Sequence, residues 1–214
     1  MKKIAIFDFD GTIANTRPVI LTTFHRTFDA MHLPQSTDVE ISATIGLPLL
    51  EAFPILCPMG TSKAEECTIT YRRIFEQVKQ EIHVSIFPHV ESTMRKLHAS
   101  SVTCTIATSR GQDSAKAFMK SFGIDDIITY IIAAENVSHA KPDPEPVIKT
   151  LQHFKLHPEN AVVIGDTHFD ISMGRNAGCM SIGVSYGYGS RESLEKAGAD
   201  AIIDDFAELS TYIL

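Results

Sequence analysis

The sequence predicts an α/β fold, in which a doubly wound parallel sheet carries an all-helical insertion after its first strand. Six short runs are mostly apolar at successive positions, as strands buried on both faces are. Helix-like segments separate most of these runs, which is the alternation of a parallel sheet with right-handed crossovers. The interval after the first run is too long for one crossover, and its helical texture predicts the insertion.

The expected strands and helices of the sheet alternate along the chain. The strands are expected at 3–9, 102–108, 127–134, 161–166, 180–186 and 201–205, and the helices at 88–100, 111–123, 144–155 and 170–178. Gly123 and Gly178 stand where two of these helices end, because glycine readily adopts the left-handed conformation of a C-cap. Helices would then cover both faces of the sheet.

The insertion is expected over residues 17–82. Its helical segments are 17–31, 47–56 and 61–82. We expect hinges near 14–18 and 83–88, where a polar run gives way to "VSIFPHV". The predicted domains are therefore a sheet domain of 1–16 and 83–214 and a helical domain of 17–82.

Composition excludes several classes of partner. The chain has 214 residues, of which 44% are hydrophobic, and a net charge of −7, so no global basic field draws it to nucleic acid or to an anionic membrane. No window approaches a membrane span, and the apolar run of "MKKIAIFDFD" is too short for a signal peptide. The four cysteines form no CxxC pair, which favours free thiols in a reducing compartment, and we expect a cytoplasmic protein. Nothing in the sequence indicates an oligomeric state.

Polar residues gather at the expected carboxyl ends of the strands. They are Asp8, Asp10 and Gly11 after the first strand, Thr108 and Ser109 after the second, Asp166 after the fourth with Asp170 one turn on, and Lys141 in "KPDPEP". Ligands of open α/β sheets bind at this edge, near the switch point, so these residues should converge.

Several carboxylates in one dry cleft require a cation, because like charges raise each other's pKa. Mg²⁺ prefers carboxylate, water and phosphate oxygens. Hydroxyl groups and the Lys141 ammonium suit the remaining oxygens of a phosphate. The residues alone therefore predict a magnesium-assisted phosphate site.

The same residues resemble a known family. "DFDGT" at 8–12, the strand-end "TS" at 108–109, the lysine of "KPDPEP" and "GDTHFD" at 165–170 are together similar to the four motifs of the haloacid dehalogenase superfamily, in order and in placement. The resemblance covers essentially the whole chain, and the insertion resembles a helical C1-type cap. "IGLPLLEAF" and "GVSYGYGSRESLEKAGADAIIDD" resemble the branch of phosphoglycolate phosphatases and PpaX-type pyrophosphatases.

The resemblance implies a role for each motif residue. It implies that Asp8 is the nucleophile that forms an aspartyl-phosphate, that Asp10 is the general acid and base, and that Lys141 neutralises the reacting oxygens. The implied phosphate-binding residues are Thr108, Ser109, Gly11 and Arg17, although Arg17 at the hinge could equally stay in water. The implied magnesium residues are Asp8, Asp10 through its carbonyl, Asp166 and the supporting Asp170. Asp8 must stay ionised to attack, and we expect Mg²⁺ and Lys141 to hold it so.

The implied activity is hydrolysis of a small phosphorylated metabolite, such as phosphoglycolate or pyrophosphate. Asp10 favours phosphoryl transfer, since the dehalogenases of the superfamily lack an aspartate at that position. A phosphosugar mutase is one alternative, but Ile20 lies near the position where such relatives carry a histidine. A catalytically idle binding module is another.

Three further features have simpler structural interpretations. Asp170 could be only the N-cap of a helix that starts at Ile171. The glycine-rich segment 187–190 is expected to be a loop, because it lacks dinucleotide-binding spacing. His153 and His157 are expected not to bind a metal, because Pro158 ends their helix.

Overall fold

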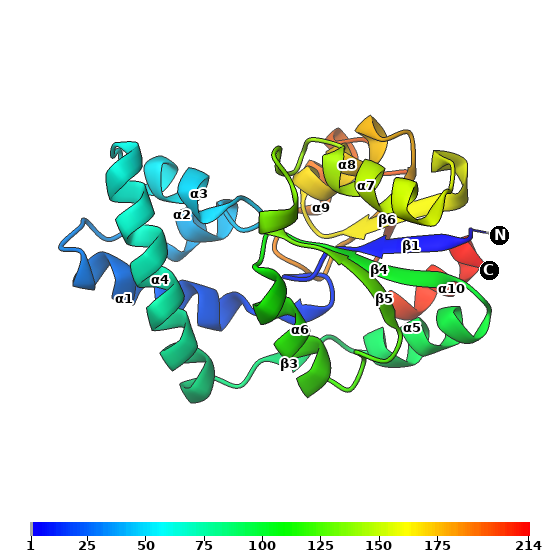
Figure 1. Ribbon diagram of the computed structural model, residues 1–214, viewed down its shortest axis with the longest axis horizontal. Coiled ribbons are helices and arrows are strands. Elements are labelled where there is room, and N and C mark those ends of the chain that lie inside the picture. Colours follow the sequence, from blue (N-terminus) through cyan, green and yellow to red (C-terminus); the bar gives the residue numbers. More distant parts are fainter. Residues whose placement is uncertain (1) are drawn as a thin grey trace.

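Six parallel strands form the central sheet of the computed structural model, which describes residues 2–214 (Figure 1). The strands are β1 (Ile4–Phe7), β4 (Thr103–Ala107), β5 (Ile128–Ile132), β6 (Ala161–Gly165), β7 (Met180–Val184) and β8 (Ala201–Ile203), in the order β5-β4-β1-β6-β7-β8. This doubly wound order confirms the predicted fold and puts a switch point beside β1. Phe7 pairs with both Ile106 and Ile164, so the carboxyl ends of three strands meet at one edge.

Helices cover both faces of the sheet (Figure 1). They are α5 (Val90–Ala99), α6 (Gln112–Ser121), α7 (Glu145–Phe154), α8 (His168–Asn176), α9 (Arg191–Lys196) and α10 (Leu209–Ile213). Apolar residues of α7 and α8 pack on one face, and those of α5, α6 and α10 on the other. Gly123 and Gly178 have φ angles of 66° and 76°, which confirms the predicted caps. Within residues 2–214, none of the helices has both the length and the apolar character needed to cross a membrane.

One expected helix start is wrong. Helix α8 begins at His168, with Thr167 as its N-cap, and not at Ile171. Asp170 is therefore the third residue of the helix, where its Oδ2 accepts hydrogen bonds from the N–H and the hydroxyl of Thr167. This reciprocal capping box holds the Asp170 side chain over the start of the helix.

The insertion contains α1 (Arg17–Ala30), α2 (Asp38–Ala43), α3 (Leu49–Leu56) and α4 (Thr61–Glu81) (Figure 1). Helix α2 was not expected, although Thr37 and Glu40 form the capping box that precedes it. The two connecting segments pair as a short antiparallel ribbon of β2 (Ala14–Asn15) and β3 (Ser85–Ile86). This ribbon lies within the expected hinges and supports our division into domains at 16/17 and 82/83, which we keep as a proposal.

An aromatic cluster fills the insertion. The Phe53 ring of α3 lies 5.2 Å from Phe24 and 6.1 Å from Phe28, both of α1, between ring centroids. Tyr71 of α4 lies 4.9 Å from Phe24. Since three helices contribute these rings, the cluster holds the insertion together.

We expect Phe53→Ala to lower the free energy of unfolding by about 3–5 kcal/mol, because it removes a fully buried ring and leaves a cavity. Ile55→Ala, in the same helix but 63% exposed, is the control and should change it by less than about 0.5 kcal/mol. Urea unfolding measures both variants. Equal losses would contradict the proposed role of the cluster.

Candidate active site

A buried lysine joins two of the predicted carboxylates. Lys141 Nζ donates to Asp8 Oδ1 at 2.5 Å and to Asp170 Oδ1 at 2.7 Å. Asp8 follows β1, Asp170 lies in the first turn of α8, and Lys141 precedes α7. All three side chains are at least nine-tenths buried, so the ammonium has little access to other partners. The structure thus brings together three residues that the sequence predicted to converge.

Asp166 completes a cluster of carboxylates beside this ion pair. Oxygens of Asp8, Asp166 and Asp170 all lie within 4.8 Å of one another. Asp166 accepts hydrogen bonds from the Thr12 hydroxyl at 3.1 Å and from the Tyr188 N–H at 2.7 Å. The Asp10 side chain is not part of this cluster. Its backbone carbonyl is therefore the group that remains available for the predicted contact with magnesium.

Backbone segments approach Asp166 so closely that only glycine fits. At Gly11, whose φ is +91°, a Cβ would lie 2.2 Å from Asp166 Oδ2. At Gly187 it would lie 2.2 Å from the Asp166 Cβ. Gly11 thus lies against Asp166 and does not line the main cavity, although the sequence placed it with the phosphate-binding residues. The segment 187–190 is a loop, as expected, and it packs around Asp166, which its sequence did not indicate.

Burial dominates the electrostatics of the cluster. It raises the pKa of Asp8 to about 7, against the lowering effect of Lys141, and Asp170 and Asp10 raise it further. The pKa of Asp166 is also raised well above its usual value, by burial and by Asp8 and Asp170. Burial lowers the pKa of Lys141, but Asp170 and Asp8 outweigh this and hold it above its usual value. Lys141 alone therefore does not keep Asp8 fully ionised near neutral pH.

These oxygen donors fit a hard divalent cation such as Mg²⁺. One ammonium faces three buried carboxyl groups, and a cation would favour the ionised form of each. Asp8 and Asp166 would hold the cation, while Asp170 would orient Lys141. The donor set thus agrees with the cofactor predicted from the sequence.

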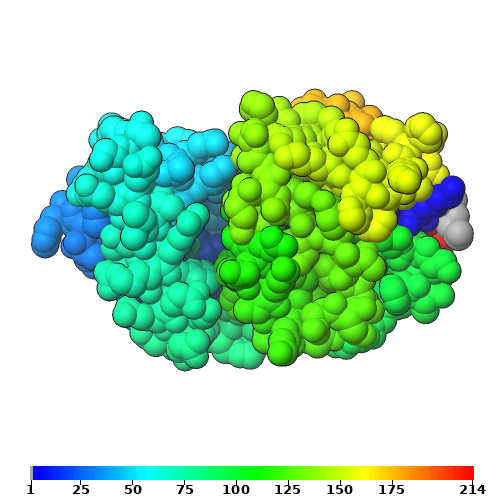
Figure 2. Space-filling model, viewed as in Figure 1, coloured from blue at the N-terminus to red at the C-terminus, as the bar shows by residue number. Residues whose placement is uncertain are grey.

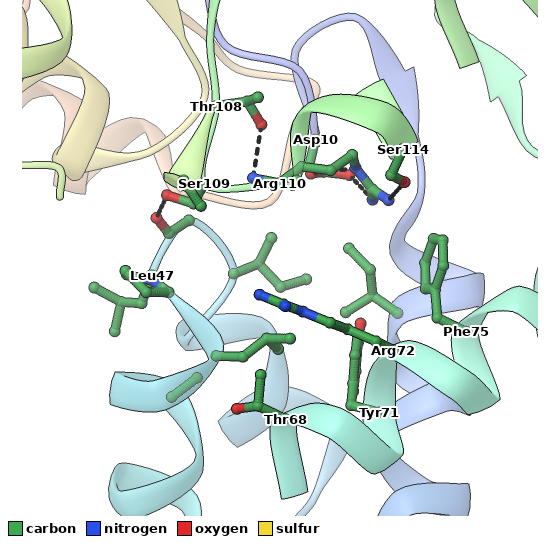
Figure 3. Close-up of a pocket in the computed structure, with 18 of the residues that line it drawn as sticks. Asp10, Leu47, Thr68, Tyr71, Arg72, Phe75, Thr108, Ser109, Arg110 and Ser114 are labelled. Carbon is green, nitrogen blue, oxygen red and sulfur yellow. Dashed lines mark hydrogen bonds and ion pairs between the residues drawn. The ribbon is translucent and has the colours of Figure 1, made fainter. Parts of the chain in front are cut away.

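Asp10 is held by an arginine that the sequence interpretation missed. Arg110 donates to Asp10 Oδ1 at 2.5 Å and to Oδ2 at 3.1 Å (Figure 3). The Thr16 hydroxyl also donates to Asp10 Oδ1, at 2.5 Å. The guanidinium carbon lies 4.8 Å from the centroid of Phe75 in the insertion and 5.1 Å from that of Phe118 in α6. Arg110 therefore links Asp10 to the contact between the insertion and the sheet. The sequence could have indicated Arg110 as a site residue, because it directly follows the strand-end "TS".

Thr108 and Ser109 line a cavity of about 650 Å³ between the insertion and the sheet, together with Asp8 and Asp10. The surface is hollowed where the cyan insertion meets the green segments (Figure 2). Ser109 donates to the Gly46 carbonyl at 2.6 Å, so the strand end touches the loop before α3. Residues 45–48 of this loop also line the cavity.

Arg17 does not line this cavity. Its Nε donates to the Ser42 hydroxyl at 3.1 Å, and its guanidinium lies 5.4 Å from the Tyr188 ring centroid. The Tyr188 hydroxyl also accepts from the N–H groups of Thr16 and Arg17, at 2.7 and 2.8 Å. Arg17 thus secures the start of α1, and nothing in this arrangement supports its predicted contact with phosphate.

The comparisons with known proteins agree on one family. Residues 5–184 match the family model described as haloacid dehalogenase-like hydrolase. The "Probable phosphatase IndB" of Dickeya dadantii is 31% identical over 98% of this chain and 92% of its own. The pyrophosphatase PpaX of Anoxybacillus flavithermus is 30% identical over 95% and 93%. A solved haloacid dehalogenase-like family hydrolase from Streptococcus pneumoniae is 25% identical, with a TM-score of 0.87 over 100% of this chain and 99% of its own.

We expect Arg110→Ala to lower the free energy of unfolding by about 3–5 kcal/mol, because it leaves the largely buried Asp10 carboxylate without its charged partner. The control is Arg95→Ala, which removes ion pairs to Glu91 and Asp126 from an exposed arginine and should cost about 1 kcal/mol or less. Chemical denaturation compares the two. A loss for Arg110→Ala no greater than that of the control would contradict the assigned ion pair.

Without a metal, Asp8 and Asp166 should destabilise the protein as the pH rises. Both ionise near 3.8 when unfolded, but the folded carboxyls keep their protons to higher pH, to about 7 for Asp8. The unfolded chain thus releases protons that the folded chain still binds, so the free energy of unfolding falls as the pH rises from about 4 to about 7. Added Mg²⁺ should raise the melting temperature more at neutral pH than at about pH 5.

Asp166→Asn should reduce both the pH dependence and the Mg²⁺ shift. Asp125→Asn, at an exposed aspartate outside the site, is the matched control and should retain both. Thermal melts with Mg²⁺ and with a chelator measure these effects. A Mg²⁺ shift of the same size in the two variants would show that Asp166 does not hold the cation.

Proposed function

Since this chain belongs to the haloacid dehalogenase-like hydrolase family, we propose that it is a Mg²⁺-dependent phosphatase that acts through an aspartyl-phosphate on Asp8. Its relatives named as phosphatase and pyrophosphatase match it over nearly its whole length, and the protein is accordingly a phosphate hydrolase. The observation that carries the mechanism is the buried contact of Lys141 with Asp8 and Asp170. A small phosphorylated metabolite is the proposed substrate.

In the first step, an Asp8 carboxylate oxygen attacks phosphorus while the bond from phosphorus to the leaving oxygen breaks. Asp10 gives its proton to that oxygen. Lys141, already 2.5 Å from Asp8, stabilises the negative charge of the reacting oxygens, and the Thr108 hydroxyl donates to the phosphoryl group. When bound, Mg²⁺ supplies neutralisation of phosphoryl charge.

In the second step, Asp10 takes a proton from water as the water oxygen attacks phosphorus. The bond from phosphorus to the Asp8 oxygen breaks, which releases inorganic phosphate and regenerates the carboxylate. Arg110 and Thr16 hold the Asp10 carboxylate beside the cavity, and Asp10 must take up a proton and release a hydrogen bond from Arg110 before it acts as the acid. The insertion lines one side of the cavity, which favours small substrates over phosphoproteins.

Two other features support this proposal over its alternatives. Asp10 provides the proton that a phosphate ester's leaving oxygen needs and a halide does not. Ile20 lines the cavity with an apolar side chain near the position where mutase-like relatives carry a histidine. The four cysteines are unpaired, which supports a cytoplasmic location as part of the proposal.

Asp8→Asn should lower kcat for an aryl phosphate by about 10³-fold or more, because it removes the nucleophile. Asp10→Asn should lower kcat by about 10²- to 10⁴-fold, because the acid and base is lost. Asp125→Asn is the control and should retain the activity of the original protein. Circular dichroism verifies folding, and normal turnover by Asp8→Asn would overturn the nucleophile assignment.

Product analysis with β-glucose 1-phosphate separates hydrolysis from mutase activity. We expect release of inorganic phosphate to exceed formation of glucose 6-phosphate. Faster isomerisation would identify a mutase. Ligand binding without turnover across a panel of phosphate esters would identify an idle binding module.

A further inference from the structure

The wall of the main cavity is largely apolar on the side of the insertion (Figure 3). Helix α1, helix α3 and the loop before α3 contribute Ile20, Phe24, Ile45, Leu47, Leu49 and Leu50. The cavity volume of about 650 Å³ lies within the range of pockets that enclose drug-sized ligands. A two-carbon acid or a second phosphate would leave most of this wall in contact with water.

Three polar side chains of α4 interrupt this wall. Thr68, Tyr71 and Arg72 are spaced three and four residues apart, so they share one face of the helix, and all three line the cavity (Figure 3). Thr68 is only 7% exposed, yet its hydroxyl has no hydrogen-bond partner within residues 2–214. Buried polar groups are normally paired, so this hydroxyl has hydrogen-bonding capacity left for a ligand atom that reaches it.

Arg72 is the cation of this face without a partner in the described part of the chain. Its guanidinium points into the cavity (Figure 3). Of the nearby acidic side chains, Glu76 pairs with Lys79 at 2.5 Å, and Glu135 accepts from the Gln112 N–H at 2.8 Å. An anionic group on the ligand would match the unpaired guanidinium.

We propose that this pocket selects phosphate monoesters whose leaving group has an apolar body and a carboxylate at its far end. This inference rests on the proposed phosphatase function. The apolar wall packs against the body, while Arg72, Thr68 and the Tyr71 hydroxyl donate to the carboxylate. Pyrophosphate would place charge against the apolar wall, and phosphoglycolate is too small to fill the pocket. We therefore expect a lower kcat/KM for pyrophosphate and for phosphoglycolate than for such esters.

The test compares kcat/KM for 4-carboxyphenyl phosphate, phenyl phosphate, phosphoglycolate and pyrophosphate with Mg²⁺. In Arg72→Gln, the ratio of kcat/KM for 4-carboxyphenyl phosphate to that for phenyl phosphate should fall by about 10- to 100-fold, as for loss of a charged hydrogen bond. Arg73→Gln is the matched control, because Arg73 is an exposed arginine of α4, as Arg72 is, but does not line the cavity, and its ratio should stay within about twofold. The ratio cancels differences in leaving-group reactivity and in folding.

Thr68→Val provides a second, nearly isosteric test. It should raise KM for 4-carboxyphenyl phosphate about threefold or more and change that for phenyl phosphate less. If Thr68→Val and the unaltered protein have the same KM for 4-carboxyphenyl phosphate, Thr68 has a structural role only, and its part in recognition is overturned.

Three outcomes would overturn larger parts of the proposal. If the ratio of kcat/KM for 4-carboxyphenyl phosphate to that for phenyl phosphate is equal in Arg72→Gln and Arg73→Gln, recognition by Arg72 is overturned. A higher kcat/KM for pyrophosphate or phosphoglycolate than for both aryl esters would overturn the proposed substrate class. Failure of the unaltered protein to hydrolyse any of the four compounds with Mg²⁺ would overturn the phosphatase proposal itself.

Discussion

The buried contact of Lys141 with Asp8 and Asp170 is the interaction on which the site depends. The edge of the sheet brings three carboxyl groups together, and one ammonium lies among them. Removing one partner of such a buried ion pair typically costs about 3–5 kcal/mol, because the other charge is left in a poorly solvated place. Burial still raises the pKa of Asp8 to about 7, so the site has a deficit of positive charge that suits a divalent cation.

Two aspartates only two residues apart occupy separate electrostatic environments. Asp8 contacts Lys141 at the edge of the sheet, whereas Asp10 contacts Arg110 and Thr16 beside the insertion. Each carboxylate therefore has its own cation, although Asp10 still raises the pKa of Asp8. Arg110 also packs against Phe75 of the insertion, so the position of Asp10 is coupled to the contact between the two parts of the molecule.

The two parts contribute different chemistry to one cavity. The sheet supplies charged and hydroxyl groups from its carboxyl edge, and the insertion supplies an apolar wall with the polar face of α4. A ribbon of two short strands connects them, and the three carboxyl groups of the cluster all come from the sheet domain. Under the proposed function, the sheet domain carries the reaction and the insertion contributes to substrate recognition.

The sequence by itself determined the doubly wound sheet, the helical insertion and the convergence of Asp8, Lys141, Asp166 and Asp170. Buried strands and strand-end residues are local patterns, and parallel strands place their carboxyl ends at one edge. Only the tertiary structure decided that Arg110 holds Asp10, that Arg17 binds Ser42 and that the loop at 187–190 packs around Asp166. These contacts join residues 22 to 100 positions apart, and no local periodicity records which distant side chain a flexible arginine or a glycine-rich loop will meet.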